Sequence, residues 1–253
     1  MKFGNFVETE ALAEFVAHCS ATYADQGIMT VVGEPGLGKT IAVESFRRTI
    51  TDRVAYLEVE VEPTVKSTLA SLYTALTGDI PSGTKHEIRR ALLNELAKKE
   101  TALICIDEAQ RFQGNREWEM LRSLFDDGSL QLALVFIANP LAYKVICRHP
   151  MLDNRVTLRY TYPKMRLKEA LSVMPRFHSV FVGTDPVLLT YIHDKLAHTN
   201  LRLLRNFTRE ALHVIDNMGA KRLTQDVVDA ALIRMGRFDP DQEGFADDEE
   251  GDE

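Results

Sequence analysis

Residues 33–40 read Gly-Glu-Pro-Gly-Leu-Gly-Lys-Thr, the complete G-x-x-x-x-G-K-[ST] pattern of a phosphate-binding loop. The apolar residues 28–32 before the loop predict a strand, and residues 41–48 after it predict a helix. A strand, a glycine-rich turn and a helix N-terminus form the local structure that cradles an anion. The sequence therefore predicts a nucleoside triphosphate site, in preference to an ordinary glycine-rich turn.

The residues of this loop have distinct expected roles. Because glycine has no Cβ, the backbone N–H groups near Gly33, Gly36 and Gly38 can approach the β-phosphate closely. Lys39 is expected to reach the β- and γ-phosphates, and the Thr40 hydroxyl is expected to bind Mg²⁺. The other predicted nucleotide contacts of this segment are Glu34, Pro35, Leu37 and Ile41.

The pattern of apolar residues divides the chain. Apolar strands alternate with amphipathic helices up to about residue 160, which predicts an α/β fold with a parallel sheet flanked by helices. After Pro163 the sequence indicates helices only, at about 166–174, 187–197, 201–217 and 224–235. We therefore expect an α/β core at 1–163, a small all-helical domain at 164–237 and a disordered acidic tail at 238–253.

The expected elements of the core follow from periodicity and from turn residues. The predicted strands cover 28–32, 54–59, 102–106, 132–138 and 156–160. The predicted helices cover 9–24, 41–48, 64–76, 84–99 and 116–125.

The acidic tail conceals the charge of the rest of the chain. The 253 residues carry a formal net charge of −7, and residues 238–253 contain nine acidic residues and no lysine or arginine. Without those nine charges, residues 1–237 carry a net charge of +2. Such a tail cannot bury a core. It is interpreted as a solubilising extension, with a nucleic-acid mimic or a docking peptide for a partner as the alternatives.

Composition also limits the class of protein. No apolar run approaches the length of a membrane span, and the N-terminal residues do not resemble a signal peptide. Cys19, Cys105 and Cys147 lie far apart in apolar surroundings and fit no metal-binding spacing. The sequence therefore predicts a cytoplasmic protein with reduced core cysteines and no membrane partner.

Two further polar positions follow predicted strands. Residues 102–106 end at Asp107 and Glu108, which is the Walker B pattern: Asp107 is expected to hold Mg²⁺, and Glu108 to deprotonate the attacking water. Strand 132–138 ends at Asn139, which is expected to contact the γ-phosphate or that water. A plain Asn-Pro turn is the alternative interpretation of Asn139.

Hydrolysis of a triphosphate also needs positive charge near the transferring phosphoryl group. Arg155, just before the last predicted strand, is a candidate arginine finger that acts on the nucleotide of a neighbouring subunit. Arg148 and Arg159 are its rivals. Arg202, at the start of a predicted lid helix, is a candidate sensor of the nucleotide bound to its own subunit.

One pair of histidines does not have the spacing of a metal motif. His193 and His198 are five residues apart, so on a continuous helix they would point to different faces. The i, i+4 spacing of a helical zinc site is absent. Both are expected to be ordinary helix residues.

The phosphate loop, the Asp-Glu pair, Asn139, Arg155 and a lid with Arg202 together resemble an AAA+ ATPase over nearly the whole chain. Three shorter segments are similar to the Mu B, TnsC and TniB family of transposition proteins. These segments are Asn-Phe-Val-Glu-Thr at 5–9, Ile-Asp-Glu-Ala at 106–109 and Leu-Arg-Leu-Leu-Arg-Asn at 201–206.

This resemblance implies an ATP-dependent target-DNA selector of a phage or transposon. ATP-bound subunits would assemble head to tail into a filament on double-stranded DNA, recruit a transposase, and disassemble when the transposase stimulates hydrolysis. Phe6 and Val7 would pack near the adenine, and Arg202 would contact the nucleotide.

The DNA contact is expected to come from the ATPase body, because we see no room for an N-terminal DNA-binding domain of the Mu B kind. Non-specific contact with the DNA backbone requires exposed basic side chains. The candidates are Lys66, Lys85, Arg89, Arg90 and Arg116, although solvated helix faces explain each of them equally well.

Three other functions remain open. A helicase loader of the DnaC type would need a helicase-binding extension, and we see none of useful length. A non-enzymatic nucleotide switch would not need Glu108 as a base. An ATPase of a secretion or signalling complex would lack DNA-stimulated activity.

Overall fold

The computed structural model describes residues 4–49, 53–98, 101–112, 114–140, 144 and 150–237. The chain divides into two compact units. One unit is Ala11–Pro163. The other is Lys164–Glu253 together with Met1–Glu10. Arg148, Cys147 and the acidic tail lie outside the described residues.

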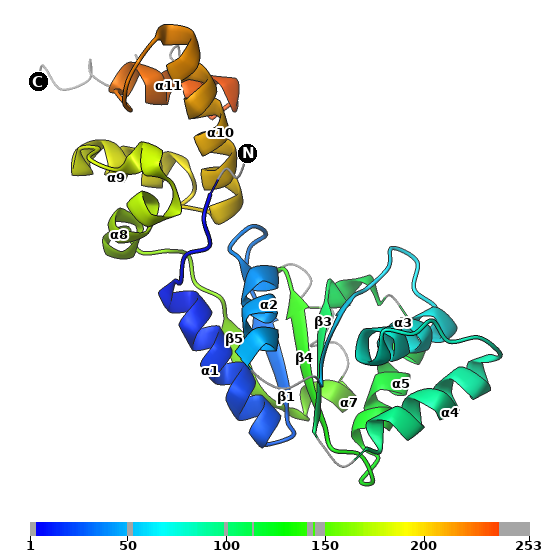
Figure 1. Ribbon diagram of the computed structural model, residues 1–253. Helices are drawn as coiled ribbons and strands as arrows, with labels where there is room; N and C mark the ends of the chain where they lie inside the picture. The colour runs from blue at the N-terminus through cyan, green and yellow to red at the C-terminus, as the bar shows by residue number, and fades with distance from the viewer. Residues whose placement is uncertain are drawn as a thin grey trace, which may run out of the picture. The chain divides into compact units, whose positions relative to one another are not determined.

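A parallel sheet lies at the centre of the first unit (Figure 1). Its strand order is β2-β3-β4-β1-β5, so β1, which precedes the phosphate loop, lies between β4 and β5. In register, Val32 at the end of β1 pairs with Ala138 at the end of β4, and Ile106 of β3 pairs with Phe136 of β4. The strands are β1 (Ile28–Val32), β2 (Val54–Glu58), β3 (Ala102–Asp107), β4 (Leu132–Ala138) and β5 (Val156–Thr161).

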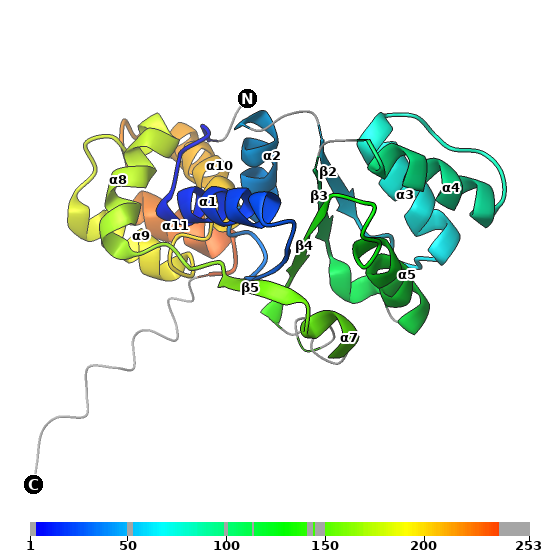
Figure 2. The same cartoon turned by 90° about the horizontal axis from the view of Figure 1, so that it is seen from below.

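Helices cover both faces of this sheet, as Figures 1 and 2 show. Helices α1 and α2 pack on one face, and α3, α4 and α5 pack on the other. The helical elements of the unit are α1 (Glu10–Ala24), α2 (Lys39–Thr49), α3 (Val65–Thr77), α4 (Lys85–Leu96), the 3-10 turn η1 (Ala109–Arg111), α5 (Asn115–Phe125) and α7 (Pro150–Asp153).

Strand β3 shows why the layers form. All of its residues are buried, and successive side chains point to opposite faces of the sheet. Leu103 and Cys105 join the core beneath α1 and α2, whereas Ile104 and Ile106 join the core beneath α3, α4 and α5. A continuous apolar strand with a helical layer on each face is typical of parallel sheets. The predicted α/β fold with a parallel sheet flanked by helices is confirmed.

Side-chain caps fix two of the helix starts. Thr64 accepts a hydrogen bond from the Ser67 backbone N–H, and Ser67 Oγ accepts one from the Thr64 N–H in return. Thr84 and Glu87 form the same capping box at the start of α4. Helix α4 ends at Leu96, three residues before the predicted end.

The second unit is helical in its described residues. Its core is built around Phe181 and Phe207, whose rings stack with centroids 6.2 Å apart. The elements are α8 (Leu167–Phe177), the 3-10 turn η2 (Ser179–Phe181), α9 (Pro186–Lys195), α10 (Leu201–Met218) and α11 (Gln225–Arg234).

The N-terminal segment groups with this helical unit, which differs from the predicted division at residue 163 alone. The Asn5 backbone N–H donates to the Phe177 carbonyl at 2.7 Å, and Val7 packs against the helical core. Gly4 has φ +155°, and a Cβ there would lie 2.1 Å from the Phe177 ring, so glycine is required at this approach.

The expectation that both histidines are helix residues holds for His193, which lies on α9, and is wrong for His198. Helix α9 ends at Lys195, and His198 lies beyond it in a left-handed turn rather than on a helix. The argument that a continuous helix would point the two rings to different faces therefore does not apply.

None of the helices in the described ranges combines the length and the apolarity that a bilayer crossing requires.

Replacement of Phe207 tests the helical core. Because this ring is fully buried, Phe207→Ala should lower the free energy of unfolding by about 3–5 kcal/mol. Met218→Ala, on the same helix at an exposed position, should change it by less than about 0.5 kcal/mol. Urea denaturation followed by circular dichroism measures both, and equal effects of the two variants would contradict the assignment of this core.

Candidate functional site

The phosphate loop runs from the end of β1 into the first turn of α2. Gly36 and Gly38 have φ of +87° and +105°, backbone conformations that favour glycine. At Gly33 the reason for glycine is different: a Cβ would lie 2.8 Å from Cβ of Tyr162. The Lys39 ammonium donates to the Gly33 and Glu34 carbonyls at 2.7 and 2.9 Å, so the lysine folds back over its own loop.

The carboxyl ends of β1, β3 and β4 lie at one edge of the sheet, because these strands are parallel and paired in register. The Gly33 N–H donates to the Ala138 carbonyl at 3.2 Å, so Asn139, the next residue in the chain, lies beside the loop. Asp107 ends the adjacent strand β3, and Glu108 follows it. Lys39, Thr40, Asp107, Glu108 and Asn139 thus come from segments that meet at this edge.

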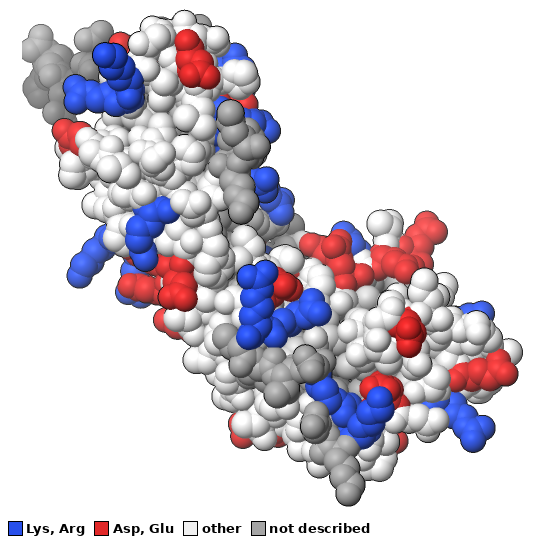
Figure 3. All heavy atoms as spheres, in the orientation of Figure 1, with Lys and Arg blue, Asp and Glu red and all other residues white. Residues whose placement is uncertain are grey.

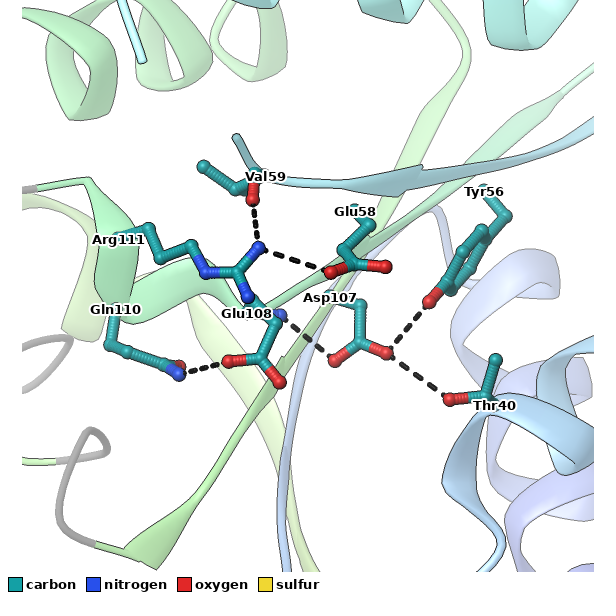
Figure 4. A network of polar contacts seen from close by, with 8 residues as sticks. All are labelled: Thr40, Tyr56, Glu58, Val59, Asp107, Glu108, Gln110 and Arg111. Carbon is teal, nitrogen blue, oxygen red and sulfur yellow. Dashed lines mark hydrogen bonds and ion pairs between the residues drawn. The ribbon is translucent and has the colours of Figure 1, made fainter. Parts of the chain in front are cut away.

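The Asp107 carboxylate is the centre of a polar network (Figure 4). Its Oδ2 accepts hydrogen bonds from the Tyr56 hydroxyl at 2.8 Å and from the Thr40 hydroxyl at 3.4 Å. Its Oδ1 accepts from the Glu108 backbone N–H at 2.8 Å. Asp107 is 8% exposed, so these donors stabilise a largely buried negative charge.

Thr40 and Asp107 have the geometry of two ligands of one Mg²⁺ ion. Magnesium binds oxygen at about 2.1 Å in an octahedron, which places neighbouring ligand oxygens about 3 Å apart. The 3.4 Å between Thr40 Oγ1 and Asp107 Oδ2 is close to that separation. A hydroxyl and a carboxylate are also the hard oxygen donors that Mg²⁺ prefers.

Tyr56 is a functional candidate that sequence reasoning missed. Burial, followed by the neighbouring Asp107 charge, raises the pKa of its phenol well above the usual range. The phenol therefore stays protonated and donates to Asp107 across the physiological pH range. The sequence signal is weak, because only the β2–β3 pairing brings Tyr56 beside the end of β3.

Glu108 occupies a strained position. Its φ is +55°, in the left-handed region that residues with a side chain rarely adopt, and it begins the η1 turn. Gln110, also missed by sequence reasoning, donates its amide N–H to Glu108 Oε2 at 2.5 Å. Arg111 ties the same turn to the end of β2 through the Val59 carbonyl and Glu58. Figure 4 shows Glu108 held between this turn and Asp107.

Arg155 lies at the amino end of the parallel strands, opposite the end that carries the phosphate loop. It precedes β5, whose first residue Val156 pairs with Ile28, the first residue of β1. The five residues of β1 separate that edge from the phosphate loop, about 16 Å along the strand. Arg155 donates to both oxygens of Asp126, at 2.6 and 2.9 Å. Its rival Arg159 forms an ion pair with Asp153 at 2.6 Å.

Other predicted site residues lie in the helical unit. Arg202 is exposed in the first turn of α10, where Asn200 Oδ1 accepts a hydrogen bond from its backbone N–H at 3.1 Å. Phe6 is 60% exposed, whereas Val7 packs against the helical core. Ile41, in the first unit, is 51% exposed on α2.

The candidate DNA-contacting residues lie on three helices, α3, α4 and α5. Lys66, Lys85 and Arg116 are exposed, near the starts of α3, α4 and α5. Arg89 is half-buried, and its guanidinium donates a hydrogen bond to Ser123 Oγ at 3.4 Å. On the face in Figure 3, lysines and arginines lie in several separate groups with acidic residues between them.

Comparison with known proteins agrees with this architecture. Residues 22–146 match the family described as "AAA domain". The chain is 25% identical over 263 residues to a "Potential ATP-binding protein" of Staphylococcus aureus, covering 90% of this chain and 95% of that one.

Similar solved structures include the ORC2 protein of Aeropyrum pernix, with a TM-score of 0.70 and 15% identity over 91% of this chain and 69% of that one. Another is Drosophila ORC bound to DNA, with a TM-score of 0.68 and 20% identity over 88% of this chain. Only 60% of that ORC chain is covered. The Holliday junction branch migration motor RuvB of Thermotoga maritima has a TM-score of 0.64 and 16% identity over 90% of this chain and 70% of that one.

The parallel sheet flanked by helices is the fold of an AAA+ P-loop NTPase. Within that fold, residues 22–146 are the part that is similar to the "AAA domain" family.

Replacement of Lys39 tests nucleotide binding at this edge. Lys39→Ala removes the charge expected on the phosphates and should weaken binding of Mg·ATP by about 10- to 100-fold. Fluorescence anisotropy of a labelled ATP analogue measures the affinity. Lys85→Ala, an exposed lysine on α4, is the control and should bind as the wild type does. Equal affinities of the two variants would refute the site.

Proposed function

We propose that the protein binds Mg·ATP and hydrolyses it at the interface between two copies arranged head to tail. The position of Arg155 carries this proposal. About 16 Å of strand separates its edge of the sheet from its own phosphate loop, so an arginine at this position is suited to a neighbour's nucleotide. A heterologous interface of this kind repeats from copy to copy.

Residues at the carboxyl edge would perform the chemistry of one subunit. Lys39 and the loop N–H groups hold the phosphates, and Thr40 and Asp107 hold the Mg²⁺, which supplies charge neutralisation at the β- and γ-phosphates. Glu108 takes a proton from water as the water oxygen bonds to the γ-phosphorus. The bond from that phosphorus to the bridging oxygen breaks, and ADP leaves. Asn139 orients the water or the γ-phosphate.

The contact between Gln110 and Glu108 restrains the side chain of the proposed base. An amide donor at 2.5 Å occupies one oxygen of the carboxylate that must accept the proton. This contact fixes the orientation of the carboxylate, and the other oxygen, Oε1, is not engaged in it and can accept a proton from water.

The guanidinium of Arg155 is likewise held, by an ion pair with Asp126, and the proposal requires it to leave Asp126 for a phosphate. The Arg155 and Asp126 side chains are 36% and 37% exposed, so solvent and salt screen the pair although it forms two hydrogen bonds. The γ-phosphate of a neighbour can therefore compete for the guanidinium at small cost. Arg159 remains a rival because its ion pair with Asp153 is equally accessible.

The finer part of the proposal concerns what the assembly acts on. We propose that ATP-bound copies form a filament on double-stranded DNA, contact its backbone through Lys66, Lys85, Arg89 and Arg116, and recruit a transposase that stimulates hydrolysis. The support is the similarity to the Mu B, TnsC and TniB proteins at residues 5–9, 106–109 and 201–206. The DNA-bound ORC structure also shares this fold. In this scheme Arg202 senses the γ-phosphate, and Phe6 and Val7 pack near the adenine.

Mixing two inactive variants tests the shared site. Glu108→Gln keeps its arginine but lacks the base, and Arg155→Ala keeps its base but lacks the arginine. Each alone should hydrolyse little ATP. An equal mixture should recover about a quarter of wild-type activity, because random head-to-tail pairing completes that share of the interfaces. Phosphate release measured with ATP and DNA reports the recovery.

No recovery in the mixture would mean that both groups act within one chain, which would refute the interface site. Arg159→Ala in place of Arg155→Ala identifies which arginine is the finger.

Negative-stain microscopy with ATP, with and without double-stranded DNA, tests the assembly. Filaments should form only when both are present, and Glu108→Gln should stabilise them because binding survives while hydrolysis stops. Replacing Lys66 or Lys85 with alanine should weaken DNA binding equally for all sequences and lower the salt-dependence slope by about 1 per phosphate contact. Closed rings that are indifferent to DNA would refute the filament.

A further inference from the structure

The turn between α9 and α10 has an unusual backbone. Ala197, His198 and Thr199 have φ values of 52°, 60° and 53°. Three successive residues with side chains in the left-handed region are conformationally costly, and such backbone persists only where its surroundings enforce it. The turn also satisfies backbone carbonyls at the end of α9: the Thr199 N–H donates to the His193 carbonyl at 3.2 Å, and the Asn200 N–H donates to the Leu196 carbonyl at 2.9 Å.

The turn folds His198 back onto the end of α9. The rings of His193 and His198 lie with centroids 5.3 Å apart at an interplanar angle of 64°. Together with the Asp194 carboxylate, they offer three ligand atoms that all lie within 4.8 Å of one another. Small side-chain rotations bring such atoms to the separations found around one tetrahedral or octahedral ion.

His193 is oriented as metal-binding histidines are. Its side chain is 3% exposed, and Nδ1 is hydrogen-bonded to Thr199 Oγ1 at 2.7 Å. This bond fixes the ring and leaves Nε2 as the nitrogen for an ion, with a partner on the opposite nitrogen that holds the tautomer. Asp194 and His198 are exposed, so an ion can enter from solvent.

The charge of Asp194 favours a cation at this place. Asp194 lies in the last turn of α9, where the helix dipole already provides partial negative charge. A carboxylate there is unfavourable by itself, and a bound cation would neutralise both.

We propose that His193, Asp194 and His198 bind a divalent ion of the zinc class, with water completing the coordination. Two imidazoles and one carboxylate suit Zn²⁺ and disfavour Mg²⁺ and Ca²⁺, which take oxygen ligands. The role is structural. The ion fixes the turn that leads to Asn200, whose Oδ1 caps α10 by accepting from the Arg202 and Leu203 N–H groups.

Calorimetric titration of Zn²⁺ into the metal-free full chain, without nucleotide, tests the site. The wild type should bind one ion, and both His198→Asn and Asp194→Asn should lose at least about 100-fold in affinity. Asparagine is chosen at 198 because it tolerates the left-handed conformation. His213→Asn, an exposed histidine on α10, is the matched control and should bind as the wild type does.

Thermal unfolding gives an independent readout. Zn²⁺ should raise the melting temperature of the wild type and of His213→Asn, but not that of His198→Asn or Asp194→Asn. Circular dichroism of the metal-free variants shows whether they are folded, and Asp194→Asn, at an exposed position, keeps the test valid if His198→Asn unfolds. Absence of Zn²⁺ binding by the wild type, or equal binding by a folded Asp194→Asn, would overturn the proposal.

Discussion

The parallel, in-register pairing of β3, β4 and β1 is the constraint on which the rest of the structure depends. It brings the ends of three strands to one edge, so that the phosphate loop, Asp107, Glu108 and Asn139 come together although they are far apart in the chain. The same pairing, extended to β5, places Arg155 at the other edge. In the proposed chemistry each edge supplies half of a site, so two copies are needed.

Asp107 shows how a carboxylate is held at this edge, where we propose that Mg²⁺ binds. A largely buried carboxylate is costly unless it is hydrogen-bonded, and it receives donors from β2, from the phosphate loop and from its own backbone neighbour. Tyr56 keeps its proton because burial and this carboxylate oppose ionisation. Glu108 and Arg155, by contrast, each form a hydrogen bond with a side chain, Gln110 and Asp126, that nucleotide binding or assembly can replace. In this account assembly and nucleotide binding release two restrained groups.

The helical unit has its own constraint, the left-handed turn before α10. It is built from a buried imidazole, a threonine hydroxyl on that imidazole and an asparagine cap. An ion at His193, Asp194 and His198 would make the start of α10, which carries Arg202, more rigid. The proposed metal site and the proposed ATPase site are separate hypotheses, and each can fail without the other.

The sequence alone determined the order of strands and helices and the phosphate loop, because glycines at fixed spacing, apolar runs and Thr caps act over a few residues. It also located Asp107 and Asn139 at strand ends. Tertiary structure decided which side chains meet across paired strands and within turns. Tyr56 reaches Asp107 only through the β2–β3 register, Gln110 reaches Glu108 only through the η1 turn, and His198 meets His193 only because α9 stops at Lys195. These contacts depend on non-local pairing and on positive φ angles, and helical or strand periodicity carries no signal for either.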